Sequence, residues 1–300
     1  MNIKEQLKSV VENGEVKLQE PMKLHTTFRV GGPAEYFVEP MLDEVCPLIS
    51  LLKKEGMAYT LIGNGSNLLV SDEGIPGVVI SFGTQMADVE VSGNKITAQA
   101  GILLSRLASF AAANALSGLE FASGIPGTLG GAIAMNAGAY GGEMKDVVES
   151  VEVLEDGEVK VYSCEDMKFS YRHSAVQEKE MIVLSVTLCL TPGDADEITS
   201  AVKELNAKRI EKQPLNFPSA GSTFKRPQGY FAGKLIEDAG LRGYKVGGAQ
   251  VSEKHCGFVV NTGDATAADV YHLILDVQKK VKEQFGVTLE PEVRMIGRFE

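Results

Sequence analysis

Two short segments of this chain hold its most informative glycines, and these limit the possible folds more than any other feature. The first segment is Gly63-Asn64-Gly65-Ser66-Asn67-Leu68, directly after a predicted strand. The second, residues 118–142, holds eight glycines around Gly124-Ile125-Pro126-Gly127-Thr128. Either segment alone could simply be a tight turn. Because glycine lacks a Cβ, however, backbone N–H groups in such loops can converge on an anion. Together the segments favour two loops around a diphosphate, with Thr128 beginning a helix beside the second.

Composition narrows the class of protein. The 300 residues, 44% hydrophobic and 23% charged, suit a globular protein of two or three domains. The 29 basic and 40 acidic residues give a net charge of −11, which argues against nucleic acid bound through a broad basic surface. Residues 203–254 have the opposite sign of net charge from the whole chain, because they hold ten basic and five acidic side chains. A window of this sign suits a small phosphate-bearing substrate, although basic helix ends are often merely solvated.

The cysteines and the hydropathy pattern indicate a compartment. Cys46, Cys164, Cys189 and Cys256 form no Cys-x-x-Cys pair, so we expect neither a zinc site nor a disulfide framework. Charged residues interrupt every apolar stretch near the N-terminus, and the longest apolar run, residues 181–190, is half a membrane span. We therefore expect a cytoplasmic protein with no membrane partner and no bound metal.

Hydrophobic periodicity predicts an α+β fold with a mixed sheet. Turn signals at Ser92-Gly93-Asn94 and Asp156-Gly157 indicate hairpins. The predicted strands cover residues 35–39, 59–62, 78–80, 95–99, 147–154, 158–162, 181–190 and 288–295. The predicted helices cover residues 42–55, 103–114, 195–212 and 267–285, the third of them amphipathic and the last ended by Gly286.

Familiar nucleotide and metal motifs are absent. No Gly-x-Gly-x-x-Gly opens a βαβ unit, which disfavours a Rossmann domain. The segment beginning at Gly229 resembles a P-loop, but it has one residue too few between its glycines, and Leu235 stands where Ser or Thr must bind magnesium. His-Glu-x-x-His does not occur either.

Several motifs, in order along nearly the whole chain, resemble those of the UDP-N-acetylenolpyruvoylglucosamine reductases. They are Phe28-Arg29-Val30-Gly31-Gly32-Pro33-Ala34, residues 63–68, residues 124–132, Asn136-Ala137-Gly138-Ala139-Tyr140-Gly141, Tyr171-Arg172, Ala220-Gly221-Ser222-Thr223-Phe224-Lys225 and Leu289-Glu290-Pro291-Glu292-Val293-Arg294. The short stretch after Tyr171 leaves no room for an inserted loop with a tyrosine, so the chain resembles the type II branch.

The resemblance implies an architecture and a reaction. The architecture is an FAD-binding fold of the vanillyl-alcohol oxidase (PCMH) type, with subdomains over residues 1–80 and 81–192, and a substrate-binding α+β domain over residues 193–300. The reaction is NADPH-dependent reduction of UDP-N-acetylglucosamine enolpyruvate to UDP-N-acetylmuramate through non-covalent FAD, in peptidoglycan precursor synthesis. We expect a monomer. The alternative is another FAD-dependent oxidase of the same superfamily, against which the Ser222, Arg172 and Glu292 motifs argue.

Motif positions also imply individual roles. Ser222 corresponds to the proton donor, Arg172 to the cation that polarises the substrate carboxylate, and Glu292 to an assisting acid. The expected substrate contacts are Tyr171, Lys212, Arg226 and His255, the last two standing where other members have asparagine and glutamine. The expected FAD contacts are Gly63, Asn64, Gly65, Ser66, Asn67, Leu68, Gly124, Ile125, Pro126, Gly127, Thr128, Gly131, Ala132, Asn136 and Gly138.

Overall fold

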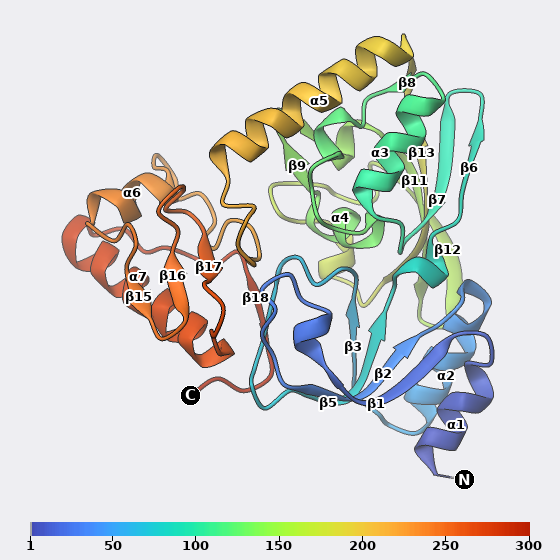
Figure 1. Cartoon of the computed structure of the whole chain (residues 1–300). Coiled ribbons are helices and arrows are strands. Elements are labelled where there is room, and N and C mark those ends of the chain that lie inside the picture. Colours follow the sequence, from blue (N-terminus) through green and yellow to red (C-terminus); the bar gives the residue numbers. More distant parts are fainter. Residues whose placement is uncertain (1) are drawn as a thin grey trace. The chain divides into compact units, whose positions relative to one another are not determined.

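A computed structural model describes residues 2–300, and Figure 1 traces the whole chain. The chain divides into two compact units, each assembled from separate stretches of sequence. Unit 1 comprises residues 2–17, 37–64 and 78–209, and unit 2 comprises residues 18–36, 65–77 and 210–300. The domain boundaries at 80/81 and 192/193 remain a prediction.

The helices match the sequence prediction closely. Residues 195–212 and 267–285 are helical with the predicted bounds, and Gly286 ends the latter with a left-handed φ of 68°. The predicted helix over 42–55 begins as a 3-10 turn before α2. The helices are α1 (Ile3–Val10), α2 (Val45–Lys54), α3 (Leu104–Ala113), α4 (Leu129–Met135), α5 (Ala195–Lys212), α6 (Ala232–Asp238) and α7 (Ala267–Phe285).

The strands confirm the α+β class. Most predicted strands are present within a residue or a few of the expected bounds. In chain order they are β1 (Glu15–Pro21), β2 (Pro33–Glu39), β3 (Tyr59–Ile62), β4 (Leu68–Val70), β5 (Ile75–Ser81), β6 (Val89–Ser92), β7 (Lys95–Gln99), β8 (Leu116–Ser117), β9 (Gly138–Ala139), β10 (Gly142–Glu143), β11 (Val148–Glu155), β12 (Glu158–Ser163), β13 (Ile182–Cys189), β14 (Thr191–Pro192), β15 (Lys245–Val246), β16 (Ala249–Val251), β17 (Val259–Asn261) and β18 (Arg294–Ile296).

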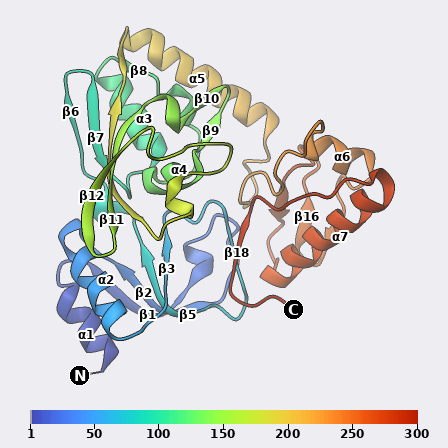
Figure 2. The same cartoon turned by 180° about the vertical axis from the view of Figure 1, so that it is seen from behind.

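Unit 1 contains an antiparallel sheet in the order β12-β11-β13-β7-β6. The predicted hairpins join β6 to β7 and β11 to β12, with Asp156 and Gly157 in the left-handed region. Figure 2 shows these strands from behind. Helix α4 packs on β13 and β7, and it follows directly from the second glycine segment. A parallel pair, β3 with β5, makes the sheet content mixed, as predicted. The strand that precedes the first glycine segment is β3.

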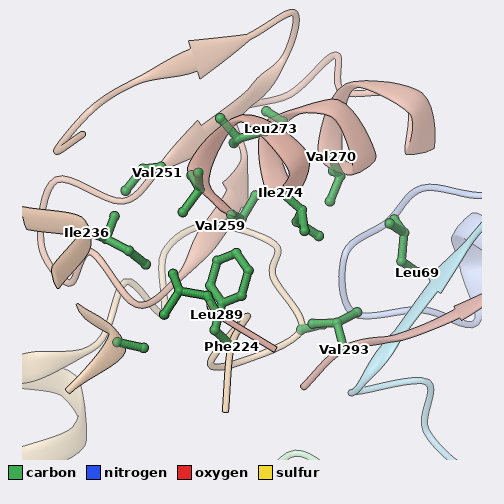
Figure 3. Packing of buried hydrophobic residues seen from close by; sticks show 14 of the residues in the cluster. Leu69, Phe224, Ile236, Val251, Val259, Val270, Leu273, Ile274, Leu289 and Val293 are labelled. Atoms are coloured by element: carbon green, nitrogen blue, oxygen red, sulfur yellow. The ribbon is translucent and has the colours of Figure 1, made fainter. Parts of the chain in front are cut away.

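Unit 2 is built around helix α7. Its buried side chains, spaced three and four residues apart, face the antiparallel strands β15-β16-β17. Figure 3 shows Val270, Leu273 and Ile274 of α7 packing with Phe224 and Leu289 from segments outside the helix. Thr266 caps the helix by accepting a hydrogen bond from the Asp269 N–H. The core of this unit thus draws together the segments that carry Ser222 and Glu292.

The strand predicted over residues 288–295 is wrong for most of its length. Regular pairing begins only at β18, which runs parallel to β4 through Arg294↔Leu68 and Ile296↔Val70. Pro291 lies in the middle of the predicted run and forms only an isolated bridge with Phe224. Proline has no N–H to donate to a sheet, so the alternating hydrophobic pattern around it overstated the strand.

No helix among residues 2–300 has the length and apolar character that crossing a lipid bilayer requires.

Replacing Leu273 with alanine should destabilise the protein. Its side chain is fully buried in the core of unit 2, so truncation leaves a cavity and should lower the free energy of unfolding by about 2–5 kcal/mol. Leu275 on the same helix is 42% exposed, and Leu275→Ala should cost less than about 1 kcal/mol. Urea unfolding of both variants checks this, and equal losses would contradict the assigned orientation of α7.

Candidate functional site

In unit 1 the start of the first glycine segment packs tightly against the second. A Cβ placed on Gly63 would lie 2.1 Å from Thr128 Oγ1, a distance that no side chain tolerates. The Asn64 side chain donates to the Pro126 carbonyl at 2.6 Å. Glycine at position 63 is therefore required by this close approach. The two segments that the sequence singled out lie side by side here.

The second segment is held by backbone bonds to the chain before α3. Leu129 and Gly130 donate to the carbonyls of Ile102 and Ala100 at 2.9 and 2.8 Å. Thr128 is the N-cap of α4, so a helix does begin there as predicted, although its hydroxyl makes no capping bond. Ala132 is buried in the first turn of α4, beside Gly131. The loop from Gly124 to Thr128 is thus fixed at its far end by α4.

Both the nitrogen and the oxygen of the Asn136 side-chain amide form hydrogen bonds within the protein. Asn136 ends α4 in the left-handed region with φ 42°, and its amide donates to Glu143 at 2.6 Å and to the Ser170 carbonyl at 3.2 Å. Its Oδ1 accepts from the Lys145 N–H. Gly138 follows in the small ribbon of β9 and β10. The side chain of Asn136 therefore braces the segment that leads to Arg172.

Arg172 lies in a tight turn in which Ser170 and His173 exchange backbone hydrogen bonds at 3.1 Å. Its φ of 56° is left-handed, which is uncommon for a residue other than glycine. Gln177 donates to the Arg172 carbonyl at 3.0 Å, and the guanidinium lies 5.3 Å from the ring centre of Tyr171. Strained backbone of this kind clusters at functional sites. No sequence pattern pointed to the bracing by Gln177 and Asn136.

In unit 2, Ser222 and Glu292 lie on neighbouring segments although they are far apart in sequence. Thr223, adjacent to Ser222, accepts at its carbonyl from the Glu292 N–H at 2.8 Å. Thr223 is completely buried and is itself fixed by bonds to Gly257 and Val259. The predicted proton donor and the predicted acid are therefore set by one rigid backbone arrangement.

Asn67 also bears on Glu292. Its side chain donates to the Glu292 carbonyl at 3.0 Å, and its own carbonyl accepts from the Arg294 N–H at 2.9 Å. Leu68 follows in β4, the strand that pairs with β18. Gly65 lies so close to His25 that a Cβ on Gly65 would be 2.0 Å from the His25 carbonyl oxygen. Ser66 lies in the turn between Gly65 and Asn67. The sequence motif marked Asn67 as a flavin contact but gave no sign of this bond to Glu292.

The remaining predicted contacts lie elsewhere in unit 2. Lys212 is exposed at the end of α5. The Arg226 guanidinium stacks 3.9 Å from the ring centre of Phe231. Lys225, which belongs to the same sequence motif as Ser222, forms an ion pair with Glu290. Among residues 2–300 there is no cluster of three or more His, Cys, Asp or Glu side chains arranged for a metal ion.

His255 has a defined tautomer. Its Nδ1 accepts from the Gly257 N–H at 3.0 Å, so the ring proton resides on Nε2, and the ring meets Phe258 edge to face at 5.1 Å. Burial lowers the pKa of His255 below its ordinary value of 6.5. At neutral pH the side chain therefore offers one hydrogen-bond donor and carries no charge.

This burial predicts a pH dependence of stability. Between the lowered folded-state pKa of His255 and 6.5 the unfolded chain binds more protons, so stability is retained above pH 6.5 and falls as the pH drops below it. Urea unfolding at pH 7 and pH 5.5 should show a smaller loss for His255→Gln than for the unmodified protein. Equal losses in the two proteins would refute the assignment.

Comparison with known proteins places this geometry in a family. The FAD binding domain family matches residues 36–163, and the C-terminal domain of UDP-N-acetylenolpyruvoylglucosamine reductase matches residues 213–296. The chain is 60% identical over 293 residues to the UDP-N-acetylenolpyruvoylglucosamine reductase of Agathobacter rectalis, covering 93% of both chains.

Solved structures agree. The crystal structure of UDP-N-acetylenolpyruvylglucosamine reductase from Thermus caldophilus matches with a TM-score of 0.80 and 38% identity, over 95% of this chain and 99% of that one. The BBE-like 1 protein of Physcomitrella patens, at 16% identity and a TM-score of 0.50, shares the fold over 64% of this chain and 44% of its own. The expected fold class, an FAD-binding fold followed by a C-terminal α+β domain, is confirmed. The chain therefore belongs to the UDP-N-acetylenolpyruvoylglucosamine reductase family of FAD-dependent oxidoreductases.

Proposed function

We propose that this protein reduces UDP-N-acetylglucosamine enolpyruvate to UDP-N-acetylmuramate in peptidoglycan precursor synthesis, with NADPH as the electron donor and non-covalent FAD as the cofactor. The observation that carries the proposal is the placement of Ser222 and Glu292 on neighbouring segments, tied by the bond from Glu292 to Thr223. A proton donor and an acid held together by backbone are what protonation of a developing carbanion requires. Family membership supplies the identity of the substrate.

The residues of unit 1 fit an FAD. A Cβ on Gly63 or Gly124 would collide with its surroundings, whereas a Cβ on Gly131 would have Thr128 Oγ1 at 3.5 Å as its nearest neighbour. No hydrogen bond among residues 2–300 has the Asn64 N–H as its donor, so that group is available to an anion. Bound FAD would supply the hydride chemistry between NADPH and the enolpyruvyl carbon. The expected contacts at Gly63, Asn64 and residues 124–132 are the part of the set that this geometry favours.

Each proposed catalytic residue has a distinct task. Ser222 delivers a proton to the carbon next to the substrate carboxylate, and it needs the developing negative charge there because a serine hydroxyl is a weak acid. Arg172 binds and polarises that carboxylate, for which its planar guanidinium is suited. Glu292 assists as an acid or as an orienting group. His255, as a neutral donor, and Arg226 bind the polar part of the substrate.

The visible spectrum of the purified protein tests the proposal directly. We expect a flavin absorption band that NADPH bleaches and that UDP-N-acetylglucosamine enolpyruvate restores under anaerobic conditions. Denaturation should release the flavin, since the proposed cofactor is not covalently attached. Rapid recovery of the band with air and none with the enolpyruvyl sugar would instead favour an oxidase. A colourless protein that binds no FAD would overturn the proposal.

Replacing Ser222 with alanine should separate the two halves of the reaction. Bleaching of the flavin by NADPH should keep its rate, because no proton from Ser222 is needed there. Reoxidation by the enolpyruvyl sugar should slow by about 10²–10⁴-fold, the usual contribution of a positioned proton donor. Stopped-flow absorbance measures both phases. Ser219→Ala, at another half-buried serine of unit 2, is the matched control, and unchanged reoxidation in Ser222→Ala would remove the assigned role.

A further inference from the structure

Arg209 occupies a position on α5 that normally carries an apolar side chain. Ile198, Val202 and Leu205 lie on the covered face of this helix, at the spacing of three and four residues that one face requires. Arg209 continues the same face one turn after Leu205 and is partly buried, whereas the adjacent Lys208 is exposed. Helix α5, drawn in gold in Figure 1, therefore carries a cation among its partly buried residues.

The charge of Arg209 has no counter-ion in the part of the chain that the structure describes. Among residues 2–300 no carboxylate forms an ion pair with it, and its buried Nε has no hydrogen-bond acceptor. Lys208, by contrast, is paired with Glu204. Burial lowers the pKa of the Arg209 guanidinium, which reflects the cost of removing an unpaired charge from water. Such a cost is offset when an anion binds.

The guanidinium lies against the second glycine segment. A Cβ on Gly124 would come within 2.9 Å of Arg209 Cδ and 3.1 Å of its Nη1, so the arginine in this position packs closely against the glycine backbone. Asn206 lies one turn earlier on the helix, and its Oδ1 would be 2.9 Å from the same Cβ. The residues that follow Gly124 are those that contact Gly63 and Asn64. An unpaired cation is therefore seated on the loop that carries the best-supported FAD contacts.

We propose that Arg209 binds the diphosphate of FAD at the Gly124 loop. Guanidinium groups bind phosphate oxygens with two parallel hydrogen bonds, and Arg209 brings a full positive charge to this loop. The inference rests on the FAD binding proposed above. The glycine motifs by themselves would bind the diphosphate through backbone N–H groups alone. The proposal adds to them a cation from α5, which lies outside those motifs.

Flavin titration of the full-length chain, stripped of cofactor, tests this. Arg209→Gln should weaken FAD binding by about 10- to 100-fold, the loss expected for a charge-assisted hydrogen-bonded pair. Binding of riboflavin, which has the ring but no phosphate, should change less than twofold. Arg209→Lys should restore part of the FAD affinity. Lys208→Gln removes the same charge from the exposed neighbour and should leave both affinities unchanged.

Two further measurements separate this role from the alternatives. The flavin-free Arg209→Gln protein should have the same melting temperature as the unmodified protein or a higher one, because an unpaired cation has been removed. A lower melting temperature, together with equal losses of affinity for FAD and riboflavin, would show a purely structural role and overturn the proposal. An unchanged FAD affinity with a raised KM for the uridine diphosphate sugar would assign Arg209 to the substrate and also overturn it. If the unmodified chain binds no FAD, the proposed function fails independently of Arg209.

Discussion

The close approach of neighbouring side chains to glycine backbone is the constraint on which unit 1 depends. Gly63 meets Thr128, Gly124 meets the side chains of α5, and Gly130 lies against Ala100, each at a distance that a Cβ would forbid. These contacts join different parts of the chain and so help to fix the loops. The same absence of side chains that permits the packing leaves peptide groups accessible to an anion. Packing and ligand binding therefore impose one and the same requirement on these positions.

Much of the fold followed from local patterns. Helix α7 has its predicted bounds because apolar spacing, the Thr266 cap and the terminal Gly286 all agree there, and α5 also has the bounds predicted from its sequence. The hairpins at Gly93 and Gly157 were predictable for the same reason, since their turn residues adopt positive φ. The conformation of residues 288–293 was not predictable in this way, because an alternating pattern indicates a strand only where a partner strand and free N–H groups are present. Pro291 lacks the latter.

The site was predicted as a set of residues and not as a set of contacts. Asn67 and Asn136 were expected to touch FAD, yet the side chain of one holds the Glu292 carbonyl and that of the other holds the Ser170 carbonyl. These are long-range bonds to backbone, and no spacing in a single sequence encodes them. Arg209 escaped attention because an arginine near a helix end is usually solvated. In the sequence, Arg209 differs from a solvated arginine only in its helical spacing from Ile198, which places both on one face of α5. That spacing is informative only once the covered face of α5 is known.

The pairing of β18 with β4 has a consequence for how the chain is made. Asn67 and Glu292 are 225 residues apart, and the strands that follow them are hydrogen-bonded neighbours. During synthesis, β4 leaves the ribosome early and has no partner until residue 296 has been added. Its N–H and C=O groups stay in water, or with transient partners, for most of translation. Contacts of such sequence separation also slow folding, because a long loop must close before they form. The backbone frame around Glu292 is therefore among the last features of the protein to be completed.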